Sequence, residues 1–203
     1  MFDPTVARAR PLVVLGIDPG VSCCGYGAVR RDGANVEALA YGVLRTAASA
    51  PLPERLAALG ADLEGLVADL EPAALAVERV LFQVNARTAM SVGQASGLAL
   101  VAAARAGVAV FQYSPNEVKL AIAGDGGAAK PEVQAMVARL LQLDATPRPA
   151  DAADALALAL CHLWRAPLRA ATGGDAPAVA PRLRAAIERA VAGSGPRPKD
   201  AVR

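Results

Sequence analysis

Residues 147–164, PRPADAADALALALCHLW, place two aspartates at the head of a segment that is otherwise almost wholly apolar. Residues three apart share one face of a helix, so Asp151 and Asp154 begin a stripe that continues through Leu158 to Cys161. Because the prolines at 147 and 149 oppose a helix arriving from upstream, we expect the helix to begin near Ala150. The apolar stripe has to face the core, which places both carboxylates at the rim of that core.

Two interpretations of this aspartate pair stay open. One is helix capping, since the helix dipole favours negative charge in the first turn. The other is functional, because two carboxylates at the rim of a buried stripe repel each other and lose hydration. In that case a positive group must lie near them or one of them must stay protonated. A divalent metal ion is the most direct candidate.

The rest of the chain predicts a layered α/β fold. Residues 12–17 form an apolar run typical of a buried strand, and 25–30 and 35–46 follow it as strands separated by the turn signal RDGA. These three strands are expected to pair as an antiparallel meander. Beyond them we expect helices at 52–70, 86–105, 131–142 and 150–165, with strands at 73–78 and 108–113. The order implies a five-stranded mixed sheet flanked by helices.

Two further acids stand where predicted strands end. Asp18 follows the first strand and Glu78 ends the fourth. In open α/β sheets, sites gather at the carboxyl ends of strands, so these side chains lie side by side if the two strands are parallel neighbours. The final helix would bring Asp151 and Asp154 to them. Four carboxylates in one place call for metal, and ligands that are all oxygen select a hard ion such as magnesium or manganese.

Length and patterning limit the remaining possibilities. With 203 residues we expect one domain at 12–165, preceded by an extension at 1–11 and followed by a flexible tail at 166–203 rich in Ala, Pro, Gly and Arg. The apolar windows are too short or too interrupted to span a bilayer, and the first eleven residues lack a secretory signal. We therefore expect a cytoplasmic protein with no membrane contact. Its three cysteines are expected to be reduced.

The net charge of +2 is no evidence for nucleic-acid binding. Residues 166–203 hold seven Arg or Lys against three Asp or Glu, which leaves fourteen against sixteen in the rest of the chain. The body is slightly acidic, so any basic surface must come from local arrangement or from the tail.

Four segments, LGIDPGVSCCGYG, VERVLFQVNARTAMSVGQASG, PNEVKLAIAGDGGAAKPEVQAMV and DAADALALALCH, occur in this order between residue 12 and about residue 165. In them the chain resembles the RuvC Holliday-junction resolvases, crossover junction endodeoxyribonucleases of the ribonuclease H-like fold. The resemblance implies that Asp18, Glu78, Asp151 and Asp154 are catalytic, metal-binding carboxylates. It also implies two magnesium ions, for which manganese can substitute, and hydrolysis that leaves 5′-phosphate and 3′-hydroxyl ends.

The same resemblance assigns expectations to four more residues. Lys119 and Lys130 match lysines that contact the scissile phosphate, the alternative being solvated surface lysines. The family commonly has an aromatic residue three positions after the glutamate, where it stacks on unpaired bases, and this chain has Leu81 there. Phe82 follows and offers a ring for stacking. Alternatively, Leu81 and Phe82 form a dimer or core contact.

Partners follow from the resemblance as well. The family works as a homodimer on the two-fold symmetric four-way DNA junction, and RuvA and RuvB are its branch-migration partners. The helix at 86–105 could supply the dimer interface through Met90, Val92, Ala95, Leu98 and Ala99, or those residues could simply be core. Three rivals remain: a nuclease of the YqgF type acting on RNA, an actin-like phosphotransferase, for which the chain is too short, and a junction-binding protein without cleavage activity.

Overall fold

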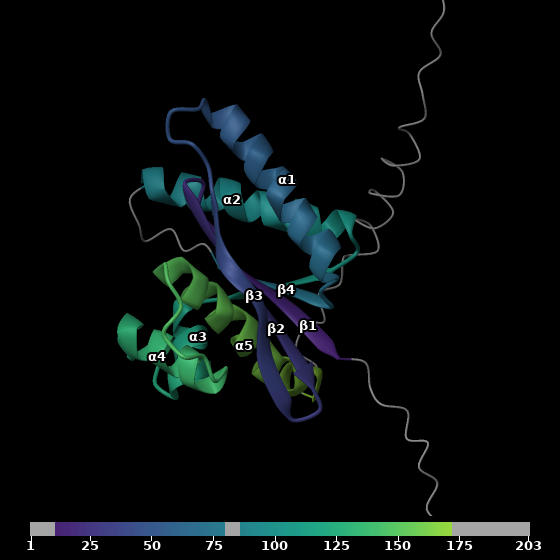
Figure 1. Cartoon of the computed structure of the whole chain (residues 1–203), viewed down its shortest axis with the longest axis vertical. Coiled ribbons are helices and arrows are strands. Elements are labelled where there is room, and N and C mark those ends of the chain that lie inside the picture. Colours follow the sequence, from purple (N-terminus) through teal and green to yellow (C-terminus); the bar gives the residue numbers. More distant parts are fainter. Residues whose placement is uncertain (1–10, 80–85, 172–203) are drawn as a thin grey trace, which may run out of the picture.

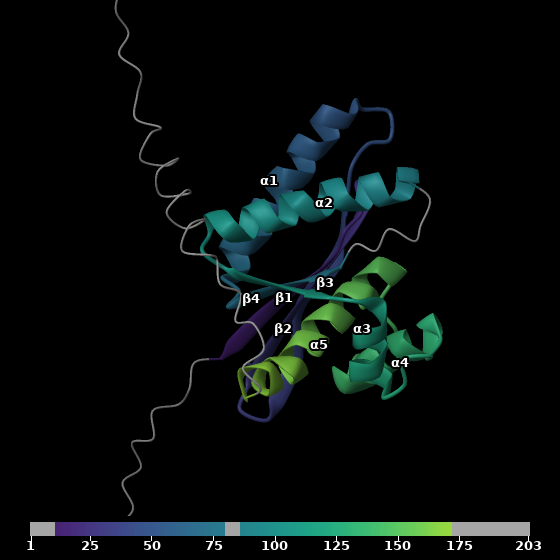
Figure 2. The ribbon, with the colours of Figure 1, turned by 180° about the vertical axis from the view of Figure 1, so that it is seen from behind.

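The computed structural model describes residues 11–79 and 86–171. One mixed sheet is covered by α1 and α2 on one face and by α3, α4 and α5 on the other (Figures 1 and 2). The strands are β1 (Leu12–Asp18), β2 (Cys23–Asp32), β3 (Asn35–Arg45), β4 (Ala74–Glu78) and β5 (Ala109–Tyr113). The helices are α1 (Leu52–Leu70), α2 (Ala86–Arg105), α3 (Pro115–Ala123), α4 (Lys130–Leu140) and α5 (Ala150–Ala171).

The sheet has the strand order β3-β2-β1-β4-β5, and its first three strands in sequence are antiparallel neighbours. β1 pairs in parallel with β4, and β4 pairs in parallel with β5. The predicted five-stranded mixed sheet is confirmed. The register pairs Ile17 with Val77, so the next residue of each strand, Asp18 and Glu78, lies at the same edge of the sheet.

The face covered by α1 and α2 holds one of the two cores. Leu59, Leu63 and Val67 of α1 are buried there beside Ala95 and Ala99 of α2. Leu98 packs against the same cluster, whereas Met90 is 66% exposed. Ala95 and Ala99, which were considered for a dimer interface, therefore belong to the core of this chain.

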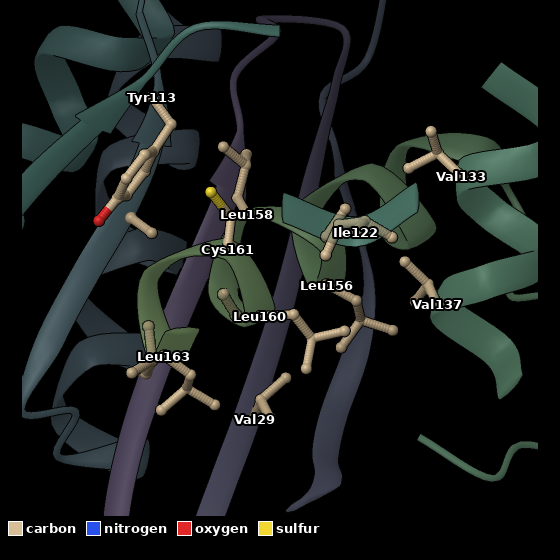
Figure 3. Packing of buried hydrophobic residues seen from close by; sticks show 14 of the residues in the cluster. Val29, Tyr113, Ile122, Val133, Val137, Leu156, Leu158, Leu160, Cys161 and Leu163 are labelled. Atoms are coloured by element: carbon tan, nitrogen blue, oxygen red, sulfur yellow. The ribbon is translucent and has the colours of Figure 1, made fainter. Parts of the chain in front are cut away.

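The opposite face is built around α5. Every residue from Ala152 to Leu163 is buried apart from Asp154, which is half-buried. Figure 3 shows the side chains of α5 packed between the sheet and the helices α3 and α4; the labelled set is Val29, Tyr113, Ile122, Val133, Val137, Leu156, Leu158, Leu160, Cys161 and Leu163. The predicted inward stripe through Leu158 and Cys161 is confirmed.

Glycines in β1 and β2 let α5 lie directly on the sheet. A Cβ built on Gly16 would lie 1.9 Å from the carbonyl oxygen of Ala155, and one built on Gly25 would lie 2.1 Å from that of Asp151. Real side chains cannot approach backbone atoms so closely. The helix therefore reaches the strand ends only because these positions carry no side chain.

Two elements differ from the prediction. No helix is predicted from the sequence for 115–123, whereas the structure has α3 there, with a capping box of Ser114 and Glu117 at its start. The last helix was expected to end at 165 and ends at Ala171.

Leu81 and Phe82 lie outside the described residues, as do residues 1–10 and 172–203. All three cysteines are free thiols, and none of the helices in the described ranges is long and apolar enough to cross a membrane.

Candidate functional site

Four acidic side chains come together at one edge of the sheet. Asp18 ends β1 and Glu78 ends the neighbouring strand β4. Gly25 is the cross-strand partner of Asp18, and the backbone of Asp151 lies against Gly25. Asp154 follows one helical turn later. Three elements, β1, β4 and α5, therefore supply the cluster, in the arrangement expected from the sequence.

A cavity of about 330 Å³ opens at this cluster. Its charged lining consists of three of the acids together with Lys119 of α3 and Lys130 of α4; the full lining is Asp18, Glu78, Pro115, Val118, Lys119, Lys130, Val133, Asp154 and Leu158. Asp151 lies beside this cavity and accepts a hydrogen bond from the thiol of Cys23, with Sγ 3.3 Å from Oδ2. The structure thus places both predicted lysines next to the predicted carboxylates.

Mutual repulsion is visible in the ionisation of these acids. Burial, followed by the negative charges of Asp154, Glu78 and Asp151, raises the pKa of Asp18 to about 7, and the charge of Lys130 opposes this rise. The pKa of Glu78 is also raised, first by burial and then by Asp154. The site therefore holds more negative charge than its own cations balance.

Lys130 is the positive group that the sequence argument required beside the aspartates. Its Nζ lies 2.5 Å from Oδ2 of Asp154, and Nε2 of Gln134 donates to Oδ1 of the same carboxylate at 3.1 Å. Burial lowers the pKa of Lys130, but the hydrogen bond and charge of Asp154, with smaller contributions from Asp18 and Asp151, raise it overall. Asp154 is thus held by two side chains of α4.

The donor set fits a hard divalent cation, because it consists of carboxylate oxygens and carries excess negative charge. As the side chains stand, no group of three or more His, Cys, Asp or Glu among the described residues is arranged to hold a metal ion. In this arrangement the ammonium of Lys130 pairs with Asp154. Moving Lys130 away would release an oxygen ligand.

Sequence reasoning missed Cys23, Gln134 and Gly25, which hold or seat the two aspartates of α5. The pairing of Asp18 with Gly25 makes the β1–β2 hairpin part of the site. The predicted second strand began at residue 25, whereas β2 begins at Cys23, so this pairing was not predicted. Leu81 and Phe82, expected to contact unpaired bases, lie outside the described residues.

Comparison with known proteins agrees with this geometry. The family model of crossover junction endodeoxyribonuclease RuvC matches residues 14–162. A relative of that name from Salinispora arenicola is 50% identical over 183 residues, covering 90% of this chain and 98% of the relative. Another, from Thermobifida fusca, is 52% identical over 153 residues, covering 75% of this chain and 84% of the relative.

Solved structures give the same result. T. thermophilus RuvC in complex with Holliday junction substrate matches with a TM-score of 0.74 and 42% identity, covering 77% of this chain and 96% of that chain. The yeast mitochondrial Holliday junction resolvase, at a TM-score of 0.55 and 15% identity over 77% of this chain and 81% of that one, shares the fold. The sheet is therefore that of the ribonuclease H-like fold, and the chain belongs to the RuvC family of crossover junction endodeoxyribonucleases.

Proposed function

We propose that this protein resolves four-way DNA junctions by hydrolysing one phosphodiester bond in each of two opposed strands. The observation that carries the proposal is the cavity in which Asp18, Glu78 and Asp154 face Lys119 and Lys130. Lysines attract a phosphate, whereas clustered carboxylates repel it unless a cation lies between them. The names of the matched relatives and the junction bound to T. thermophilus RuvC support DNA as the substrate.

We assign the metal to Asp18, Glu78, Asp151 and Asp154, with two magnesium ions as the expected complement and manganese as a substitute. When bound, such ions supply an activated water and stabilise the leaving oxygen, which leaves 5′-phosphate and 3′-hydroxyl ends. The raised pKa values of Asp18 and Glu78 support this assignment, because each carboxyl is buried and also lies close to further negative charge.

Lys130 has a choice between two anions. Without substrate it pairs with Asp154. A DNA phosphate in the cavity offers a second acceptor, and an ammonium that turns to the phosphate frees the Asp154 carboxylate. Lys130 would then position the scissile group and release a ligand in the same movement. Lys119 lines the same cavity and would hold a second phosphate oxygen.

The junction has two-fold symmetry, so paired nicks call for two copies of this chain, and we propose a homodimer. RuvA and RuvB are the expected branch-migration partners, by membership of the family. Phe82, or Leu81 before it, is the residue proposed to stack on unpaired bases at the crossover.

The deciding experiment compares a synthetic four-way junction with a linear duplex of the same sequence, in magnesium and in chelator, for the wild type and Asp18→Asn. We expect symmetric paired nicks on the junction only, lost in chelator and reduced at least about 10³-fold in the variant, as for removal of a group that acts directly on the reacting atoms. Junction binding in chelator should be retained by Asp18→Asn, since the substitution removes a negative charge.

Other outcomes would select the rivals. Tight junction binding without nicks at any divalent metal would indicate a junction-binding protein without cleavage activity. Cleavage of RNA in place of the junction would indicate a nuclease of the YqgF type. Full metal-dependent cleavage by Asp18→Asn would refute the proposed catalytic site but not the proposed substrate.

A further inference from the structure

A second cavity, of about 400 Å³, lies between β3 and the segment that joins α4 to α5. Its wall on the strand side is Tyr41, whose side chain is 40% exposed. Residues 142–148 form the rest of the lining. The volume is within the range of small-ligand sites, and the cavity offers an aromatic face, a guanidinium and several polar groups.

This cavity shares a face of the sheet with the acidic cluster. Tyr41 pairs across the strands with Gly27, and a Cβ on Gly27 would lie 2.7 Å from the backbone nitrogen of Leu156 in α5. Cross-strand partners point to the same face, so Tyr41 points to the side of α5. Arg45 lies four residues further along β3 on that face, about 13 Å away.

The chain segments on both sides of the cavity continue to the acidic cluster. Arg45 is the cross-strand partner of Cys23, whose thiol donates to Asp151. On the other wall, Arg148 precedes Asp151 by three residues, so their Cα atoms are at most about 11 Å apart. Since successive nucleotides of a strand rise by about 3.4 Å along the helix axis, the cavity lies within about three to four nucleotides of the acids.

The charges of the cavity suit one nucleotide. Among its lining residues Arg148 is the cation and Asp144 the acid, and no described side chain forms an ion pair with either. Arg148 and Arg45 are exposed, so each is accessible to a phosphate. Asp144 repels phosphate, but its carboxylate can accept from the exocyclic amino group of a base.

We propose that this cavity binds a DNA nucleotide that flanks the cleaved bond, with its base stacked on Tyr41 and its phosphate on Arg148. The inference rests on the proposed function and adds a second point of contact on the strand that is cut. It makes residues 142–148 a substrate-contacting segment as well as the connection to α5.

The test measures junction binding in chelator by fluorescence anisotropy, so that cleavage does not interfere. Tyr41→Ala should weaken binding at least about fivefold, and Tyr41→Phe should restore it, because stacking needs the ring and not the hydroxyl. Arg148→Ala should make the negative slope of log K against the logarithm of the salt concentration shallower by about one, as for the loss of one phosphate contact. Arg105→Ala is the matched control, since it removes an exposed arginine at the end of α2, on the other side of the sheet.

A junction series with one abasic nucleotide placed at each of the first five positions beside the mapped cut identifies the stacked base. At one position the abasic change should weaken wild-type binding and have no further effect on Tyr41→Ala, which is the signature of a shared contact. If the wild type nicks the junction but the variants bind it as the wild type does, at every abasic position and salt concentration, this inference alone is overturned. A wild type that neither binds nor nicks the junction overturns the proposed function, and this inference with it.

Discussion

At the scale of single residues, Asp18 is the most perturbed carboxyl of the site. Its pKa is about 7 in the folded protein against the ordinary value of 3.8. Between these values the folded chain binds a proton that the unfolded chain has released. The free energy of unfolding therefore falls as the pH rises from about 4 to about 7 and levels off above the folded pKa.

Asp18→Asn cannot titrate at this position, so its free energy of unfolding should depend less on pH over that interval. We expect the variant to be more stable than the wild type at pH 7.5 in chelator, with the difference shrinking toward pH 4. Urea unfolding of both proteins at several pH values measures this. Parallel pH profiles would contradict the assigned ionisation of Asp18.

Lys130 competes with a divalent cation for Asp154. Lys130→Ala should therefore raise the affinity of the DNA-free protein for magnesium, by up to about fivefold, because a partly exposed ion pair is worth at most about 1 kcal/mol. The same variant should cleave more slowly, since it loses a phosphate contact. Isothermal titration measures the affinity, and Lys119→Ala, which lines the cavity without an ion pair to the described acids, is the control. Weaker magnesium binding by Lys130→Ala would show that the lysine does not compete.

The positions of the site residues were predictable to different degrees. Asp18 and Glu78 end apolar runs that are recognisable in the sequence, and parallel pairing of their strands suffices to bring them together. The contact between Cys23 and Asp151 was not predictable in the same way. It depends on where β2 begins and on how closely α5 lies over Gly25, which are properties of packing rather than of local pattern.

At the scale of elements, the seating of α5 on the sheet controls the geometry of the site. Gly25→Ala would place a methyl group 2.1 Å from the carbonyl oxygen of Asp151, so helix and strand must separate. We expect a loss of about 1–3 kcal/mol of stability, as for other overpacked positions, and a large loss of cleavage. Thermal unfolding and junction nicking measure the two effects.

Gly65→Ala is the matched control. It lies within α1, and a Cβ there meets nothing within 4 Å. The substitution should stabilise the protein by about 0.5–1 kcal/mol through helix propensity and leave cleavage unchanged. If Gly25→Ala cut the junction as the wild type does, the close contact of α5 with β2 would not determine the position of Asp151.

Most element boundaries followed from hydrophobic periodicity, and α1 and α2 span the expected ranges. The helix α3 was missed because it is short and only Ile122 in it is buried, so it carries little periodic signal. Its local signal is the capping box of Ser114 and Glu117. Glu117 also pairs with Arg165 at 3.6 Å, a contact with α5 that no local pattern predicts.

At the scale of the whole molecule, the charge of the chain is divided between the folded domain and the residues that follow α5. Residues 172–203 hold six basic residues (Arg182, Arg184, Arg189, Arg197, Lys199 and Arg203) and three acidic ones (Asp175, Glu188 and Asp200). A chain that ends at Ala171 keeps all of α5 and should retain junction cleavage at low salt. It should bind linear duplex more weakly and with a shallower salt dependence. Loss of cleavage at low salt would show that residues 172–203 take part in catalysis. Nicking assays and binding measurements at several salt concentrations test this.

The burial of α5 also determines how the site can open. Local unfolding starts in segments with few buried contacts, and residues 152–163 of α5 are buried apart from Asp154, between the sheet and two helices. The amide protons of this stretch should therefore be among the slowest of the described residues to exchange with solvent. Asp151 and Asp154 lie at the start of this stretch, so we expect its packing to hold their backbone in place.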